Sequence, residues 1–218
     1  GAGNGTMIVV RPTSSANTLP TSGTSYSPNL AWGSAEQIDA NNRVVFRNSG
    51  TSAGPVTGLT PETQYTITAY EYSTTGNCYN LSSPPSATRF TLSTEPSAQP
   101  TGSFTATTCT DNSIDLSFPS IAGAGITNAD GYIIMMNAGS APSNTPTDGQ
   151  AYAVNDNISG NTVAAVINST ATSSITISGL NANVQYYFTL IPYNANSTPT
   201  AQTYNYKTNG SILGANTT

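Results

Sequence analysis

The 218-residue sequence predicts an all-β protein made of two β-sandwich modules in tandem. Only 7% of the residues are charged. Thr, Tyr, Val and Ile are abundant and are interrupted by Gly and Pro, a balance typical of strands joined by turns. The chain also repeats itself, which indicates two copies of one folding unit. Each copy has a Gly-Leu turn between two strands of alternating polarity, at Gly58 and at Gly179.

The charge balance argues against several classes of partner. Ten acidic and five basic residues give a net charge of −5. The basic residues are scattered, whereas binding to a phosphate backbone or an anionic membrane surface requires clustered Lys and Arg, so we expect neither. No apolar run approaches the roughly 20 residues of a membrane-spanning helix, so we expect no membrane insertion. Low Lys content and strands rich in Thr and Asn favour an extracellular or cell-surface location.

The spacing of the repeat locates an insertion in the first copy. The expected strand at Gly5 matches the segment at Gly131, 126 positions later, whereas Gly58 and Gly179 are 121 positions apart. The first copy therefore carries five extra residues before its Gly-Leu turn, in the loop around Trp32.

A proline-rich segment separates the two copies. Prolines recur between residues 84 and 100, which favours an edge strand followed by a linker, because proline cannot donate to a central ladder. We place the boundary near Glu95, which gives a first module at residues 1–95 and a second module at residues 96–218.

The second copy begins with two expected strands, residues 102–108 and 112–118, that have no counterpart before Gly5. In the second of them, apolar side chains share one face, namely Ile114, Leu116 and Phe118. We therefore expect the first module to lack its two N-terminal strands, which leaves a core open and a sheet edge unpaired. Another chain, or the 102–118 hairpin in a strand-swapped or edge-paired homodimer, would cover that edge.

The two turns carry the most distinctive motif of the chain. Leu59 is followed by Tyr65 at the start of a strand, and Leu180 is followed by Tyr186 in the same way. With the alternating strands around them, both copies resemble fibronectin type III modules, which are seven-stranded immunoglobulin-like β-sandwiches. The resemblance implies a structural role for these four residues. It implies the same for Phe118, which stands where the family usually has a buried Trp.

The resemblance extends to tandem modules of secreted or surface-attached bacterial proteins, which share the Gly-Asn-Gly-Thr segment near the start and the later Tyr-Asn pair. In those modules Gly-Asn-Gly lies between the second and third strands, which implies that the first copy begins at its third strand. Such sandwiches host unrelated roles, so the likeness predicts the fold and not the function.

The residues offer little for catalysis. Without histidine, Ser-His and Cys-His nucleophilic sites are excluded, and so is the commonest metal ligand. No Gly-rich phosphate loop joins a strand to a helix. The acidic residues are spread along the chain, and their only close pairs are Glu36 with Asp39 and Asp111 with Asp115. We expect no enzyme activity and no cofactor.

Asp148 and Asp156, with Asn155 and Asn157, form the densest cluster of oxygen ligands. Calcium prefers such oxygens, although the spacing of an EF-hand is missing. The alternative is turn chemistry, because Asn and Asp hydrogen-bond their own loops, and we favour that interpretation over a metal site.

Two apolar features are candidate binding surfaces. Trp32 is the lone tryptophan and would either stack on a ligand or, as we favour, fill the edge of its own sandwich with Leu30. Strand alternation predicts a second surface, an apolar patch on the outer side of one sheet. Its members are Ile133, Met135, Tyr187 and Ile191. The alternative is that long neighbouring side chains or the other module cover this patch.

Cys78 and Cys109 are the only cysteines. They are expected in loops at opposite ends of their sandwiches, and a disulfide requires Cα atoms within about 7 Å. We therefore expect no disulfide between them within one chain, and pairing between chains stays open.

These features favour a non-catalytic spacer or adhesion segment of a larger extracellular bacterial protein, with a protein or a glycan at the cell surface as its partner. One alternative is a carbohydrate-binding accessory module of a secreted enzyme, with Trp32, Tyr26 and Tyr79 as stacking groups. A calcium-stabilised adhesin is the third interpretation.

Overall fold

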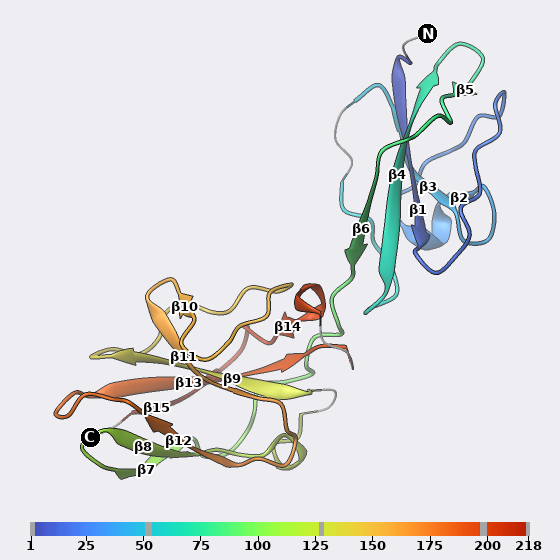
Figure 1. The fold of residues 1–218 in the computed structure, drawn as a ribbon. Coiled ribbons are helices and arrows are strands. Elements are labelled where there is room, and N and C mark those ends of the chain that lie inside the picture. The colour runs from blue at the N-terminus through green and yellow to red at the C-terminus, as the bar shows by residue number, and fades with distance from the viewer. Residues whose placement is uncertain (1–2, 51–53, 127–128, 197–199, 217–218) are drawn as a thin grey trace. The chain divides into compact units, whose positions relative to one another are not determined.

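The computed structural model describes residues 3–50, 54–126, 129–196 and 200–216 (Figure 1). Within these ranges the chain forms β-strands and short 3-10 helices, so the predicted all-β class is confirmed. The chain divides into two compact units, Gly1–Thr91 and Leu92–Thr218. Glu95, near which the boundary was expected, belongs to the second unit and pairs there with Lys207 at 3.0 Å.

The second unit is a complete sandwich of two antiparallel sheets. The smaller sheet has the order β12-β8-β7, and the larger has the order β10-β11-β9-β13-β14 with β15 also on β13. The strands of the smaller sheet are β7 Thr105–Cys109, β8 Ser113–Ser117 and β12 Ser174–Ser178. Those of the larger sheet are β9 Gly131–Ala138, β10 Asn157–Ile158, β11 Asn161–Ile167, β13 Tyr186–Asn194, β14 Asn205–Tyr206 and β15 Leu213–Asn216. Two 3-10 helices, η2 Ile121–Gly123 and η3 Ala201–Thr203, lie in the connections.

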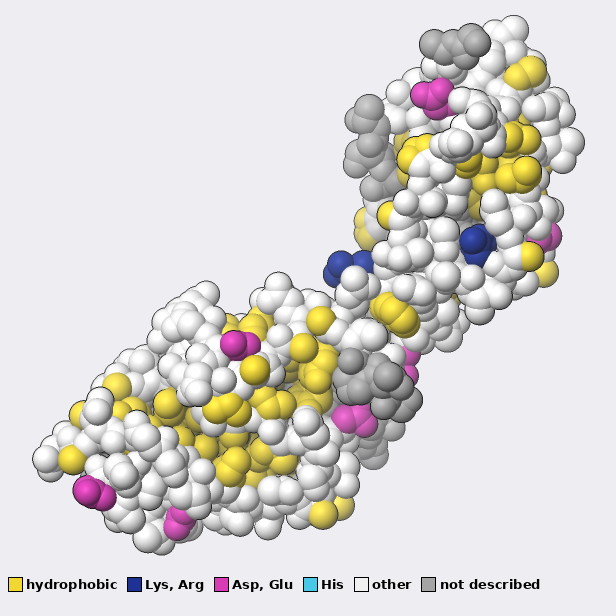
Figure 2. Space-filling model, in the orientation of Figure 1, with side chains coloured by type: hydrophobic (Ala, Val, Ile, Leu, Met, Phe, Trp, Pro, Cys, Tyr) yellow, Lys and Arg dark blue, Asp and Glu magenta, His cyan; other side chains and the backbone are white. Residues whose placement is uncertain are grey.

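Alternating side chains of the two sheets meet in one core. From β8, Leu116 is fully buried, and from the facing strands Ile134 and Phe188 are buried as deeply. Phe118 packs edge-on against Phe104 and Tyr132, with ring centroids 6.4 Å and 5.9 Å apart. On the side shown in Figure 2, hydrophobic side chains form a band along the middle of this unit, between its sheets.

The first unit has one sheet where the second has two. Its strand order is β2-β3-β1-β4-β5, with β6 also on β4, which matches the larger sheet of the second unit strand for strand. The elements are β1 Gly5–Pro12, the 3-10 helix η1 Trp32–Ser34, β2 Glu36–Gln37, β3 Arg43–Asn48, β4 Gln64–Ser73, β5 Cys78–Tyr79 and β6 Ser86–Phe90. The described residues contain no counterpart of β7 or β8, as the sequence predicts.

A third strand of the smaller sheet also fails to form among the described residues of the first unit. The repeat aligns residues 54–57 with the end of β12, yet they make only an isolated bridge between Ala31 and Thr57. β12 pairs with β8 and with no other strand. A module without β8 therefore offers this segment no ladder, which explains why the loss reaches beyond the two strands predicted.

Both turns are closed by a tyrosine hydroxyl. Thr60 N–H donates to the hydroxyl of Tyr65 and Asn181 N–H donates to that of Tyr186, each at 3.1 Å. Gly58 and Gly179 begin these turns at φ 73° and 78°, a backbone region that favours glycine. This is the tyrosine corner of immunoglobulin-like sandwiches.

Each unit contains a second corner of the same kind, which the sequence interpretation missed. Thr21 N–H donates to the hydroxyl of Tyr26, and Thr147 N–H donates to that of Tyr152, again at 3.1 Å. The signal was present in the sequence, because Tyr26 and Tyr152 keep the spacing of 126 residues.

We predict that Tyr186→Phe lowers the free energy of unfolding of the second unit by about 1 kcal/mol, because the part-buried N–H of Asn181 loses its acceptor. Urea denaturation followed by circular dichroism measures the loss. Tyr187→Phe is the matched control, since that hydroxyl lies at the surface and bonds Gln185. Equal losses in the two variants would contradict the assignment.

Candidate functional site

The sheet of the first unit is apolar on a side that no second sheet covers. In the second unit Ile134 and Phe188 are 0% and 1% exposed beneath the smaller sheet. Their equivalents in the first unit, Ile8 and Ile67, remain partly exposed. We call this surface the open face and define it by one contiguous cluster: Ile8, Val10, Val45, Tyr65 and Ile67. Val10, Val45 and Tyr65 are 2–3% exposed, so Ile8 and Ile67 are its partly exposed members.

The loop inserted before the first Gly-Leu turn covers one end of the open face. Trp32 packs edge-on against Tyr65, with ring centroids 5.5 Å apart. The backbone N–H of Trp32 donates to Thr57 O at 2.9 Å. The guanidinium carbon of Arg43 lies 5.3 Å from the centre of the indole ring. Trp32 therefore fills the edge of its own module, the interpretation favoured from the sequence, and Arg43 lies over its ring.

The predicted outer patch on the second unit is wrong for three of its four members. Ile133, Met135 and Ile191 are buried, at 1%, 0% and 1% exposure, and only Tyr187 stays partly exposed. Long side chains from the connecting segments cover them, among them Tyr152, Tyr204 and Tyr206. The alternative weighed from the sequence, cover by long neighbours, describes the structure.

The aromatic groups suggested for sugar stacking are equally inaccessible. Tyr26 and Tyr79 are 6% and 7% exposed, and their rings pack on each other at 5.9 Å. Tyr79 donates its hydroxyl proton to Thr24 O at 2.9 Å. With Trp32 lying against Tyr65 and Arg43, these three residues do not form an open stacking platform.

The two calcium candidates serve turns. Asp148 accepts from Tyr206 N at 2.8 Å, and Asp156 accepts from Ala153 N at 2.8 Å. Asn155 adopts φ 75°, as Asn does in tight turns. Across the described residues, no three acidic or cysteine side chains gather where they could hold a metal.

The close acidic pairs are likewise engaged in local structure. Asp39 accepts hydrogen bonds from Thr18, Asn41 and Asn42, which hold the pKa of this carboxyl far below its ordinary value, the Thr18 hydroxyl contributing most. Asp115 accepts from the Thr176 hydroxyl at 2.6 Å across the β8–β12 ladder. These carboxylates bind their own loops and ladders rather than converging on a reaction centre.

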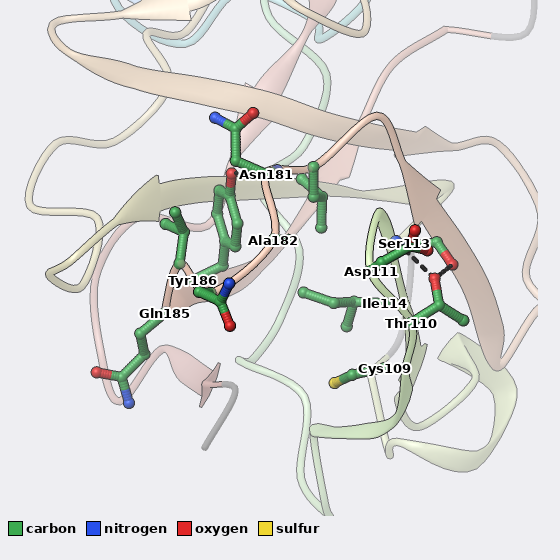
Figure 3. A pocket seen from close by; sticks show the side chains of 12 residues that line it. Cys109, Thr110, Asp111, Ser113, Ile114, Asn181, Ala182, Gln185 and Tyr186 are labelled. Carbon is green, nitrogen blue, oxygen red and sulfur yellow. Dashed lines mark hydrogen bonds between the residues drawn. The ribbon is translucent and has the colours of Figure 1, made fainter.

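An open pocket of about 810 Å³ lies at one end of the second sandwich (Figure 3). The β7–β8 turn and the tyrosine corner at Tyr186 form its walls, and Ile114 lies between them. Thr110 braces the β7–β8 turn by bonding the Ser113 hydroxyl and backbone at 2.8 and 3.0 Å. Cys109 and Asp111 also line the pocket, and the other side chains that line it are neutral.

Cys78 ends up in the first unit and Cys109 in the second, and both thiols are free and exposed. They form no disulfide with each other in this structure, and the question of pairing between chains stays open. Within the described ranges, no helix has the length and apolar character needed to cross a membrane.

The strand arrangement defines the class of the protein. Three strands facing a larger sheet, with a tyrosine corner before the longest strand, is the immunoglobulin-like sandwich architecture that fibronectin type III modules share. The described residues form one complete sandwich of this class, and in the other copy they form the larger sheet alone.

Comparisons with known proteins found similarity to solved structures alone. No protein-family model matches the sequence, and no curated protein matches it. Among solved structures, the chain is similar to the FN1–FN3 domains of chicken CNTN1, with 14% identity and a TM-score of 0.46. That match covers 97% of this chain and 56% of that one, so the chain spans about half its length. It is also similar to a two-domain fibronectin type III segment of chicken tenascin, with 12% identity, a TM-score of 0.34 and coverage of 100% and 85%.

We predict that Trp32→Ala lowers the free energy of unfolding of the first unit by about 2 kcal/mol, since a part-buried Trp loses less than the 3–5 kcal/mol typical of a core Trp. Urea denaturation followed by circular dichroism tests this. Val154→Ala, at a 52% exposed site in the second unit, is the control. Unchanged stability together with lost glycan binding would restore Trp32 as a ligand-binding residue.

Tyr132 provides a test at alkaline pH. Its hydroxyl is buried without a hydrogen-bond partner, and burial raises its pKa from 10.0 to about 12. Because the pKa is raised in the folded state, only the unfolded state ionises between about pH 10 and pH 12, so the free energy of unfolding falls as pH rises through this range. We predict that Tyr132→Phe is about 1 kcal/mol more stable at pH 7 and loses less stability between pH 10 and pH 12. Urea denaturation at pH 7 and at pH 11 measures both effects, and parallel losses in the two proteins would contradict them.

Proposed function

We propose that the chain is a non-catalytic spacer and adhesion segment of a larger extracellular bacterial protein, and that it acts through protein–protein contacts. Its composition supports an extracellular setting, with few charges and a surface rich in Thr, Ser and Asn. The acidic side chains described above serve turns and ladders, which supports a mechanical role over a chemical one.

The short connection between the two units supports the proposed spacer role. Thr91 N–H donates to Thr63 O at 3.0 Å inside the first unit, and Ser93 N–H donates to Thr203 O at 2.8 Å inside the second. Leu92 alone separates these two anchored residues. A connection of one residue offers very few rotatable bonds, whereas a flexible linker needs many.

The segment after Leu92 is bound to the second unit along its length. Asn205 donates to Ser93 O at 2.7 Å and Asn194 donates to Thr94 O at 3.0 Å. Further along, Gln99 donates to Asn209 O at 2.9 Å. The proline-rich segment that the sequence marked as a linker is therefore part of the second unit.

The adhesion role draws its support from the open face of the first unit. Apolar side chains left without a sheet over them are typical of interaction sites.

The two free cysteines provide a direct test of the spacer. Spin labels on Cys78 and Cys109 place one probe on each unit. We predict a single narrow distance distribution by pulsed electron resonance, because Thr91 and Ser93 are both anchored. Insertion of four Gly and Ser residues after Leu92 should broaden it, while the same insertion at the exposed Gly23 turn should not. A broad distribution in the unaltered chain would contradict the spacer role.

A further inference from the structure

An asparagine is followed directly by glycine at two positions of the chain, Asn4-Gly5 and Asn209-Gly210. Such a dipeptide is reactive because glycine lacks a Cβ, so its backbone nitrogen can approach the side-chain carbonyl carbon of the asparagine before it. The two dipeptides have the same reacting groups and lie in different surroundings. Each therefore serves as a reference for the other.

The second dipeptide lies in the loop between β14 and β15. Asn209 and Gly210 are both exposed in a bend, and Gly210 adopts φ 88°. Among the residues that the structure describes, no group bonds the side-chain amide of Asn209 or accepts from the N–H of Gly210. The side-chain carbonyl carbon and the backbone nitrogen are therefore free to meet.

The backbone of this loop is held while the side chain of Asn209 is left to solvent. Gln99 donates from its side chain to Asn209 O at 2.9 Å. Gln99, Asn209 and Gly210 all border an open pocket of about 570 Å³. Water therefore has access to the dipeptide.

The first dipeptide is restrained at both of its residues. Asn4 Nδ2 donates to the Thr74 hydroxyl at 2.8 Å, and Asn4 Oδ1 accepts from Thr74 N at 2.8 Å. Gly5 is buried as the first residue of β1, where a Cβ would lie 2.5 Å from a ring carbon of Tyr72. Attack on Asn4 requires its side chain to leave both bonds, so the folded sheet protects this dipeptide.

We propose that Asn209 is a site of spontaneous modification, which the folded chain converts to aspartate and isoaspartate in preference to Asn4. The nitrogen of Gly210 gives its proton to solvent base and bonds to Cγ of Asn209, and the side-chain nitrogen leaves as ammonia. Water then opens the resulting ring: cleavage at Cγ gives aspartate, and cleavage at the α-carbonyl gives isoaspartate. Each conversion consumes a water and releases an ammonia, with no change of oxidation state.

The modification alters the loop that holds Gln99. Aspartate places a carboxylate at position 209. Isoaspartate turns the carbonyl that accepts from Gln99 into a free carboxylate and adds a methylene to the backbone. Gln99 also packs close to Gly210, since a Cβ on that glycine would lie 3.4 Å from Gln99 Cγ. We therefore expect faster amide hydrogen exchange around Gln99 after conversion.

Incubation of the folded chain in mildly alkaline buffer tests the proposal. Peptide mass spectrometry follows the replacement of NH2 by OH at each dipeptide, and electron-transfer fragmentation separates isoaspartate from aspartate. We expect conversion at Asn209 to be about tenfold faster than at Asn4 or more, because Asn4 reacts only when β1 opens locally. The rate at Asn209 should rise with pH, since the nitrogen of Gly210 attacks after it has lost its proton.

Matched variants and an unfolded sample separate the effect of structure from that of sequence. In guanidinium chloride both dipeptides should react at similar rates, because unfolding releases Asn4 from Thr74. Thr74→Val removes the acceptor of Asn4 Nδ2, so conversion at Asn4 should accelerate while that at Asn209 stays unchanged. Asn209→Gln keeps an amide but requires a larger ring, so this variant should show no conversion at position 209 under the same conditions.

Two results would overturn the proposal. One is an intact Asn209 in the folded chain at a time when both dipeptides have reacted in guanidinium chloride. The other is equal rates at Asn4 and Asn209 in the folded chain, with circular dichroism showing that the strands persist. The distance measurement between Cys78 and Cys109 tests the spacer role independently of either result.

Discussion

A β-sheet whose two faces are both apolar has to be covered twice, and this requirement governs the architecture of both units. In β9 and β13 of the second unit, Ile134 and Phe188 lie on one face and Met135 and Ile191 on the other, and all four are buried. The first unit has the same requirement at β1, where Met7 and Val9 are buried on the side opposite Ile8. The burial of apolar area on both faces is the main source of stability that such a sheet can draw on.

The two faces obtain their cover from different parts of the chain. One face is covered by tyrosines from the short edge strands and the connections, and their hydroxyls bond the backbone, as Tyr206 does to Gln150 O at 2.9 Å. Burial raises the pKa of Tyr206 and of Tyr193 far above the ordinary value, with nearby tyrosines adding to the effect. This cover is present in both units, since Tyr26, Tyr72 and Tyr79 form the same layer in the first. The other face depends on a separate sheet, which only the second unit has.

Sequence patterns correctly predicted which residues share one face of a sheet, but they did not predict which side chains cover that face. Alternation correctly separated Ile133 and Met135 from Ile134, and the repeat showed that two strands are missing from the first unit. The outer patch was wrong because its cover comes from Tyr152 and Tyr206, which are distant in sequence from the strands that they protect. Period-two patterns carry no information on such contacts, which depend on how long loops return to the sheet. The loss of the third strand was missed for a related reason: a strand depends on its ladder partner, and propensity describes one segment at a time.

The larger sheet and the smaller one therefore differ in how much they depend on the rest of the module. The larger sheet and its outer cover come from one continuous segment: the hydroxyl of Tyr65 accepts from Thr60 N, and the layer of tyrosines covers the outer face. The three strands of the smaller sheet depend on one another for pairing, since β12 pairs with β8 alone and β8 joins β12 to β7. Removal of its first two strands removes the ladder of the third, while the tyrosine corner that follows that strand stays intact. The insertion with Trp32 then covers the end of the face nearest Tyr65 and leaves Ile8 and Ile67 partly exposed. Among the described residues, the strands of the larger sheet therefore form in both units, and the strands of the smaller sheet form only where all three are present.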